Sequence, residues 1–143
     1  MSKKAPRKFK VLFVCHGNTC RSQMAEALAR HTAADMIEAT SAGLMPFGEI
    51  VRPTRLVLEE RGVSLDGQYC KPLRREDCQV ADLIVNMTGR PAAALRAGDT
   101  AKIEDWDVGD PYGGDPEIYR QICDEIARRV TDLARRLRRQ QAG

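Results

Sequence analysis

Apolar and polar positions along the chain alternate in blocks that predict strands and helices in turn. Residues 11–14 are four consecutive apolar residues, mostly β-branched or aromatic, which is typical of a buried strand. Three other patterns predict further strands, the last at a sheet edge: residues 36–40, 83–87 and 101–103. This order, with helical patterns between the strands, predicts a doubly wound α/β fold: a four-stranded parallel sheet with helices on both faces.

Apolar residues spaced three or four apart predict the helices. The first helix follows the first strand and runs to about residue 32. The second is opened by Pro53 and ended by Gly62, a helical turn lies within residues 73–80, and a short helix spans residues 91–95. The last helix runs from Asp115-Pro116 to residue 137. The final helix carries one apolar stripe, and its many arginines are expected to form a solvated helix end.

The loop over residues 15–22, between the first strand and the first helix, has the composition of an anion site. Its backbone N–H groups and the helix N-terminus converge on one point, where negative charge is favoured. Cys15 in that setting is expected to ionise more readily than a free thiol with a pKa of about 8.5. Arg21 offers a planar fork for two oxygens of a tetrahedral anion, and Ser22 can donate to the sulfur. Gly17 is expected to let the backbone turn, and Asn18 to tolerate a left-handed conformation.

A cysteine at the end of a buried strand is often inert core. Inert packing, however, does not require a glycine, an asparagine and an arginine in the same turn. We therefore interpret Cys15 as a nucleophile at the base of a phosphate cradle. His16 has no partner in sequence and is expected to contribute only its backbone N–H.

A second loop, over residues 105–114, offers a proton donor. Phosphoryl transfer to a cysteine needs a proton for the departing group, and Asp110 is the predicted acid because Pro111 stiffens the backbone behind it. Asp105 and Asp107 rank lower because neither precedes the proline. The same residue types would also form an ordinary surface turn, so this motif gains weight only beside the cysteine loop.

Four segments resemble motifs of the low molecular weight protein tyrosine phosphatases and follow one another in the same order as in that family. Residues 15–22 resemble the family's C-x5-R-S loop; the others are Ser41-Ala42-Gly43, residues 81–87, and Asp110-Pro111-Tyr112-Gly113-Gly114. Thr19 and the compact 110–114 segment are most similar to the protein arginine phosphatase branch. The resemblance implies a strand order of 2-1-3-4 and a phosphatase P-loop after the first strand.

The resemblance also implies a role for individual residues. Catalysis would use Cys15, Arg21 and Asp110, through a phosphocysteine intermediate. Phosphate would be bound by His16, Gly17, Asn18, Thr19, Cys20, Arg21 and Ser22. Asn18, Ser22 and Ser41 would support the loop, although Ser41 is equally well an ordinary serine at a strand end.

Substrate choice, by the same resemblance, would depend on Thr19, Phe47 and Tyr112. A threonine at position 19 favours phosphoarginine, whereas a larger aliphatic side chain favours phosphotyrosine; the alternative is that Thr19 only fills space in the loop. Phe47 either flanks the substrate or is a hydrophobic plug. The chain departs from the family at Gln68, where a histidine often supports the loop asparagine.

Arsenate reduction coupled to thiols is the alternative function on this fold. The thioredoxin-coupled reductases have a cysteine where this chain has Met87, whereas Cys70 and Cys78 precede that strand. This placement favours a phosphatase. Cys20 is expected to form a disulfide with Cys15 under peroxide, or else to be a small buried residue.

Composition sets the remaining bounds. The chain has 143 residues, 43% of them hydrophobic, which predicts one domain over residues 10–143 after a flexible basic arm over 1–9. A net charge of +3 does not indicate nucleic acid, and no apolar run approaches the ~20 residues of a membrane span. Five cysteines without framework spacing predict reduced thiols and a cytoplasmic protein. We expect a monomer that acts on phosphorylated proteins without metal or cofactor.

Overall fold

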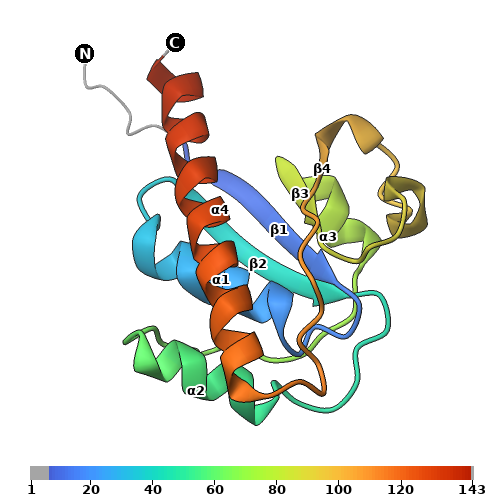
Figure 1. The fold of residues 1–143 in the computed structure, drawn as a ribbon. Coiled ribbons are helices and arrows are strands. Elements are labelled where there is room, and N and C mark those ends of the chain that lie inside the picture. Colours follow the sequence, from blue (N-terminus) through green and yellow to red (C-terminus); the bar gives the residue numbers. More distant parts are fainter. Residues whose placement is uncertain (1–6, 143) are drawn as a thin grey trace.

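The sheet confirms the predicted architecture. A computed structural model describes residues 7–142 and contains a four-stranded sheet in the order β2-β1-β3-β4, with every neighbouring pair parallel (Figure 1). The strands are β1 (Phe9–Cys15), β2 (Ile37–Gly43), β3 (Leu83–Asn86) and β4 (Ile103–Asp105). Because the strands are parallel, their carboxyl ends share one edge, which is where open α/β sheets bind ligands.

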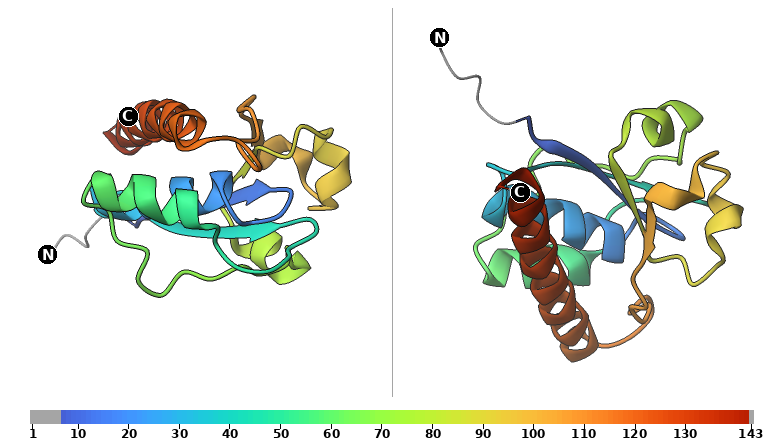
Figure 2. Two further views of the ribbon diagram at one scale, coloured as in Figure 1. Left: turned by 60° about the horizontal axis from the view of Figure 1, so that its bottom comes forward. Right: turned by 90° about the horizontal axis from the view of Figure 1, so that it is seen from above.

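Helices cover both faces of the sheet. They are α1 (Arg21–Thr32), α2 (Arg52–Glu60), α3 (Arg75–Val80) and α4 (Pro116–Ala142), with two short 3-10 turns, η1 (Ala92–Leu95) and η2 (Thr100–Lys102). Figure 2 shows α1, α2 and α4 on one side of the sheet and α3 on the other. Alternate residues of β1 point to the two sides: Phe13 packs in the core below α1 and α4, and Leu12 packs with Cys78 of α3 and Leu95 of η1.

The predicted boundaries of all four strands differ from the observed ones; the third strand ends at Asn86 rather than Met87. The fourth strand begins at Ile103 rather than Ala101, because Asp99 accepts the Ala101 N–H at 2.9 Å and turns the preceding residues into η2. The first strand already begins at Phe9, inside the predicted arm, whose residues 1–6 lie outside the described residues. The second strand extends to Gly43 because it pairs with β1 along its full length.

The long C-terminal helix begins as the sequence predicts. The Asp115 side chain accepts the Ile118 N–H at 3.1 Å, as an N-cap does, and Pro116 is the first helical residue. Within the described part of the chain, no helix combines the length and the apolar composition needed to cross a bilayer.

Candidate active site

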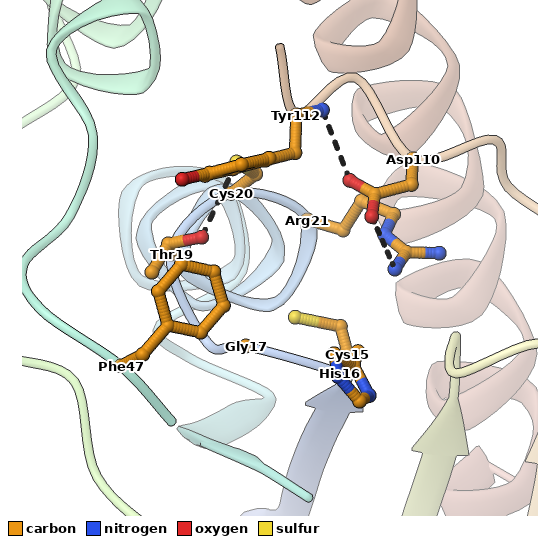
Figure 3. A pocket seen from close by; sticks show the side chains of 9 residues that line it. All are labelled: Cys15, His16, Gly17, Thr19, Cys20, Arg21, Phe47, Asp110 and Tyr112. Atoms are coloured by element: carbon orange, nitrogen blue, oxygen red, sulfur yellow. Dashed lines mark hydrogen bonds and ion pairs between the residues drawn. The ribbon is translucent and has the colours of Figure 1, made fainter. Parts of the chain in front are cut away.

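The residues that follow β1 enclose a small pocket at the carboxyl edge of the sheet (Figure 3). Its volume is about 120 Å³, and its lining comes from three segments: the loop after β1, the loop after β2, and the loop before α4. The lining residues are Cys15, His16, Gly17, Thr19, Cys20, Arg21, Phe47, Asp110 and Tyr112. The structure therefore brings together residues that lie up to about a hundred positions apart in the sequence.

Cys15 ends β1 and places its sulfur in this pocket. The Ser22 hydroxyl lies 2.8 Å from the sulfur. That hydroxyl oxygen also accepts an N–H from the Asn18 side chain at 2.7 Å, so its own proton is free to point to Cys15. All three side chains are buried. The sulfur is thus held beside a hydroxyl donor whose direction is set by its neighbours.

Asn18 holds the loop in shape from its centre. Its φ of 56° lies in the left-handed region, as predicted for this position. Besides the serine just described, its side chain donates to Ser41 Oγ at 3.1 Å and accepts the Lys71 N–H at 2.9 Å. Its carbonyl accepts bonds from Gln23 Nε2 and Cys70 Sγ, both at 3.0 Å. Because the Lys71 N–H occupies the amide oxygen, both amide hydrogens must serve the two serines.

The network ends on a buried carboxylate that the sequence analysis missed. Ser41 Oγ donates to Glu26 Oε1 at 2.6 Å, and the Glu26 residue is only 1% exposed. Arg30 at 2.6 Å and Lys71 at 3.8 Å compensate its charge. A signal was present: Glu26 lies among Ala25, Ala27 and other apolar residues on the buried face of α1, where an acidic residue needs partners.

Gln68, which stands where the family often has a histidine, contacts Gln23 rather than Asn18. Its Nε2 donates to the carbonyl and the side-chain oxygen of Gln23, at 3.1 and 2.8 Å. Gln23, in turn, contacts Asn18. Gln23 rather than Gln68 therefore supports the loop asparagine, because it lies on α1 directly beneath the loop.

Arg21 is aimed at the pocket by two backbone carbonyls. Its Nη1 donates to Met87 O at 2.6 Å and to Val108 O at 3.1 Å, and the residue is 6% exposed. Its Nη2 lies 3.5 Å from Asp110 Oδ2. Its Nε is buried and has no hydrogen-bond partner among residues 7–142. Nε and Nη2 form one edge of the guanidinium, and that edge fits two oxygens of a tetrahedral anion.

Asp110 faces Arg21 from an exposed loop. Its side chain is 51% exposed, and Oδ1 accepts the Tyr112 N–H at 3.0 Å (Figure 3). The two competing carboxylates lie elsewhere: Asp105 accepts a bond from Asn86 at 2.9 Å, and both Asp105 and Asp107 border a different cavity. Of the three candidates, the structure places only Asp110 in the pocket.

Two aromatic rings form the mouth of the pocket. Phe47 and Tyr112 meet edge to face, with centroids 5.4 Å apart, and both are about half exposed. Gly17 lies beneath Phe47: a Cβ there would come within 2.6 Å of the ring. The expectation that Gly17 allows the turn is wrong, because Asn18 carries the left-handed conformation and Gly17 instead leaves room for Phe47. His16 lines the floor and accepts the Met45 N–H with its carbonyl at 2.8 Å.

Thr19 and Cys20 form the remaining wall. Thr19 Oγ1 lies 3.5 Å from Cys20 Sγ, and the Thr19 carbonyl accepts bonds from the Val51 N–H and the Thr54 hydroxyl, at 3.3 and 3.2 Å. Cys20 Sγ also lies 3.8 Å from the Tyr119 hydroxyl. Burial raises the pKa of the Cys20 thiol, which favours its protonated form.

Comparison with known proteins agrees with this geometry. The family model described as low molecular weight phosphotyrosine protein phosphatase matches residues 10–142. The chain belongs to this family. The family's fold accounts for the sheet order 2-1-3-4 and for a loop that follows β1 and opens at the carboxyl edge.

Members of the low molecular weight phosphatase family with different activities resemble this chain to a similar degree. A glutaredoxin arsenate reductase of Synechocystis sp. is 35% identical over 126 residues, covering 87% of this chain and 95% of the relative. A protein-arginine-phosphatase of Geobacillus stearothermophilus is 31% identical over 147 residues, covering 93% and 99%. The solved YwlE arginine phosphatase from that species matches with a TM-score of 0.84 at 30% identity, covering 94% of this chain and 96% of its own.

Among the described residues, the structure contains no group of three or more histidine, cysteine, aspartate or glutamate side chains arranged to hold a metal ion.

Proposed function

We propose that this family member is a cysteine-dependent phosphatase that hydrolyses phosphorylated protein side chains through a phosphocysteine. One observation carries the proposal: the Cys15 sulfur shares a pocket with the open edge of Arg21 and with a facing carboxyl group. A thiol nucleophile, an oxyanion fork and an acid within one pocket are what phosphoryl transfer to sulfur requires.

The first step would form the phosphocysteine. The Cys15 thiolate attacks phosphorus, and the bond from phosphorus to the departing oxygen or nitrogen breaks. Asp110 gives its proton to that departing atom. Arg21 Nε and Nη2, with the loop N–H groups, bind the phosphoryl oxygens, whose charge is spread in the transition state.

The second step would release phosphate. Asp110, now ionised, takes a proton from a water molecule as that water attacks phosphorus, and the bond from phosphorus to sulfur breaks. The Ser22 hydroxyl, 2.8 Å from the sulfur, stabilises the departing thiolate. Because Asn18 already donates to the same oxygen, the hydroxyl needs no reorientation during the step.

Turnover of p-nitrophenyl phosphate by Cys15→Ser tests this proposal. We expect activity to fall by at least about 10⁴-fold, since a serine hydroxyl is a far weaker nucleophile than a thiolate. Cys123→Ala is the matched control, because Cys123 is buried between α4 and the sheet core and does not line the pocket. Undiminished activity in Cys15→Ser would refute the nucleophile.

We further propose phosphoarginine as the preferred substrate over phosphotyrosine. Thr19 lines the pocket and is only 4% exposed, and two arginine phosphatases of known sequence are more than 30% identical to the chain. Phosphoarginine turnover should exceed phosphotyrosine turnover in kcat/KM, and Thr19→Ile should reverse the order because its larger side chain fills the space beside Cys15. The same substrate preference in the unaltered protein and in Thr19→Ile would contradict the role of Thr19.

Arsenate reduction remains the second candidate, and one contact favours it. Cys70 Sγ lies 3.0 Å from the Asn18 carbonyl, so a second thiol touches the catalytic loop. Against it, Met87 is the residue that directly follows β3, and Cys78 lies in the core on the other face of the sheet. Burial and the nearby Cys15 also raise the pKa of Cys70, which disfavours its thiolate. Arsenate-dependent oxidation of glutathione or thioredoxin by the purified protein would establish the reductase.

We propose that Cys20 protects the nucleophile from peroxide. The Cys15 thiolate would attack a peroxide oxygen and break the O–O bond, giving a sulfenic acid and hydroxide; the Cys20 thiol would then displace water from the sulfenic acid to form a disulfide. Both cysteines line the same pocket. Mass spectrometry of peroxide-treated protein should show this disulfide; Cys15 as sulfinic acid beside a free Cys20 would reject it.

We also propose a cytoplasmic monomer that works without metal or cofactor. All five cysteines are free, which suits a reducing compartment. Light scattering after size exclusion should give the mass of one chain, 15.9 kDa. Retention of activity in excess chelator is the expected result for the metal-free mechanism.

A further inference from the structure

Three arginines surround a second cavity that lies apart from the catalytic pocket. The cavity has a volume of about 480 Å³ and is bordered by Arg74 and Arg75 at the start of α3 and by Arg96 after η1. All three side chains are exposed. The sequence analysis assigned no role to any of them.

The charge of these three arginines is uncompensated. None of their guanidinium groups forms an ion pair or a side-chain hydrogen bond with any of the residues 7–142, although Glu76 and Asp77 follow directly on α3. Nine other arginines in the same part of the chain do form ion pairs: Arg7, Arg21, Arg30, Arg61, Arg120, Arg129, Arg135, Arg136 and Arg138. The cavity therefore gathers three positive charges, unpaired within residues 7–142, around one opening.

Arg96 reaches the cavity from the end of η1. Arg96 has φ 51° and ψ 39°, a left-handed conformation in which glycine or asparagine is less strained than a long side chain. The chain accepts that strain at a position whose side chain lies at the rim of the cavity. The conformation also ends η1, because Arg96 is its C-cap and the Arg96 N–H donates to the Ala93 carbonyl at 3.2 Å.

The walls between the arginines are apolar. Leu95 is buried at 3% exposure, and Leu44 and Leu73 are half-buried, so the cavity offers a hydrophobic surface within a basic rim. An anion without an apolar part would leave this surface uncovered. A short acidic peptide segment with an aliphatic side chain fits both features, because its carboxylates meet the arginines while its side chain covers the leucines.

The cavity borders the catalytic loop. The Leu44 N–H donates to the Cys15 carbonyl at 3.2 Å, and the Leu73 N–H donates to the Gly43 carbonyl at 2.9 Å. One cavity wall is therefore attached by a single hydrogen bond to the residue that carries the proposed nucleophile. A protein segment that places its phosphorylated side chain in the pocket would meet the cavity with neighbouring residues, each of which spans about 3.3 Å when extended.

We propose that this cavity is a docking site for acidic segments of the phosphorylated protein substrate, flanking the modified residue. The inference rests on the proposed phosphatase function, but binding at the cavity can be measured without turnover. It assigns to Arg74, Arg75 and Arg96 the recognition of substrate protein, separate from the phosphate chemistry of Arg21.

Fluorescence anisotropy with an unphosphorylated peptide tests the site directly. The probe is a labelled peptide with four glutamates around one leucine, and the comparison peptide has lysines in place of the glutamates. We expect R74Q/R75Q to bind the acidic peptide about fivefold more weakly, the combined loss of two exposed ion pairs. Binding by the unaltered protein should weaken as salt rises.

The matched control is R128Q/R139Q, which removes the same charge from two exposed arginines of α4 that have no ion pair among the described residues. It should bind the peptide within about twofold of the unaltered protein. Arg96→Gly is a second test: it removes a guanidinium while relieving the left-handed strain, so binding should fall while the melting temperature stays the same or rises. Both results together separate a binding role from a structural one.

Turnover measurements link the site to substrate. All of these variants should hydrolyse p-nitrophenyl phosphate with unchanged kcat and KM. The preference in kcat/KM for a phosphopeptide with acidic flanks over one with neutral flanks should fall about fivefold in R74Q/R75Q only. The proposal would be overturned if the control variant lost as much of this preference as R74Q/R75Q does. It would also be overturned if the unaltered protein bound the lysine peptide, or a uridine oligonucleotide of matched charge, as tightly as the acidic peptide. Peptide binding in a protein that is inactive on every phosphate ester would instead overturn the proposed function and leave the site.

Discussion

The two loops that face each other across the catalytic pocket are built in different ways. The cysteine loop is buried throughout except at His16, and Asn18 alone has five hydrogen-bond partners there. The acid loop is exposed at Asp110 and Tyr112, and Asp110 is held only by one backbone N–H and a 3.5 Å ion pair.

This difference separates two tasks. Binding an oxyanion requires donors that are already oriented, because reorienting them during the reaction would raise the barrier. Delivering a proton requires a group that reaches several leaving atoms, and an exposed side chain can adjust to them. We therefore expect changes in the cysteine loop to alter both stability and activity, and changes in the acid loop to alter activity alone.

Asp110→Asn should give the largest effect on rate with little effect on stability. Loss of a general acid costs about 100-fold to 10,000-fold in kcat. Because the side chain is half exposed, the melting temperature should stay within about 2 °C of the unaltered protein. Asp107→Asn, in the same loop but outside the pocket, is the control. Steady-state kinetics showing less than a threefold fall in kcat would contradict the assignment.

Asn18→Ala should show the opposite behaviour by destabilising the fold as well as lowering activity. The change leaves buried donors of the loop unpartnered and puts alanine in a left-handed conformation, at a combined cost of about 2–4 kcal/mol. Thermal unfolding should show a melting temperature lower by about 10 °C. Tyr112→Ala, in the exposed loop, should change stability by less than about 1 kcal/mol; an equal loss in both variants would remove the contrast.

Two glycines, Gly17 in the cysteine loop and Gly43 at the end of β2 beside it, sharpen the comparison. A Cβ at Gly43 would lie 2.9 Å from backbone atoms of His16 and Asn18, so Gly43→Ala should destabilise the protein by about 1–3 kcal/mol. A Cβ at Gly17 meets only the exposed ring of Phe47, so Gly17→Ala should leave stability nearly unchanged and raise KM by displacing that ring. Chemical denaturation measures the stability of both variants, and kinetics measure their KM. A greater loss of stability in Gly17→Ala than in Gly43→Ala would contradict this prediction.

The smallest expected effect concerns the base of the acid loop. Both carboxylate oxygens of Glu104 accept hydrogen bonds from Arg136, at 2.8 and 2.7 Å, and this pairing lowers the pKa of Glu104. A lowered pKa means that the stabilisation is present above the unfolded-state pKa of about 4.3 and is lost as pH falls through the folded value. Glu104→Gln should therefore be less stable by about 0.5–1 kcal/mol at pH 7 and equal to the unaltered protein near pH 3. Denaturation of both proteins at both pH values tests this prediction. A difference in stability that persists at pH 3 would point to a cause other than the charge of Glu104.

The sequence by itself determined the fold class and the main candidates of the site. The buried run over residues 11–14, the helix after it and the intervening loop with Cys15 and Arg21 depend on local patterns, because strand and helix periodicity and turn chemistry are properties of neighbouring residues. The resemblance of Asp110 and its proline to a family motif added the second loop. The N-cap at Asp115 and the left-handed Asn18 followed from side-chain chemistry in the same way.

Only the tertiary structure decided which distant groups share a contact. No sequence pattern connects Glu26 to Ser41 or Gly17 to the ring of Phe47. None shows that Gln23, rather than Gln68, contacts the loop asparagine. The same holds for the start of β4, which depends on pairing with β3 and on the cap at Asp99. Such contacts arise when parallel strands and their connecting loops meet at one edge of the sheet, and the packing of several elements, rather than the order of residues in any one of them, fixes their geometry.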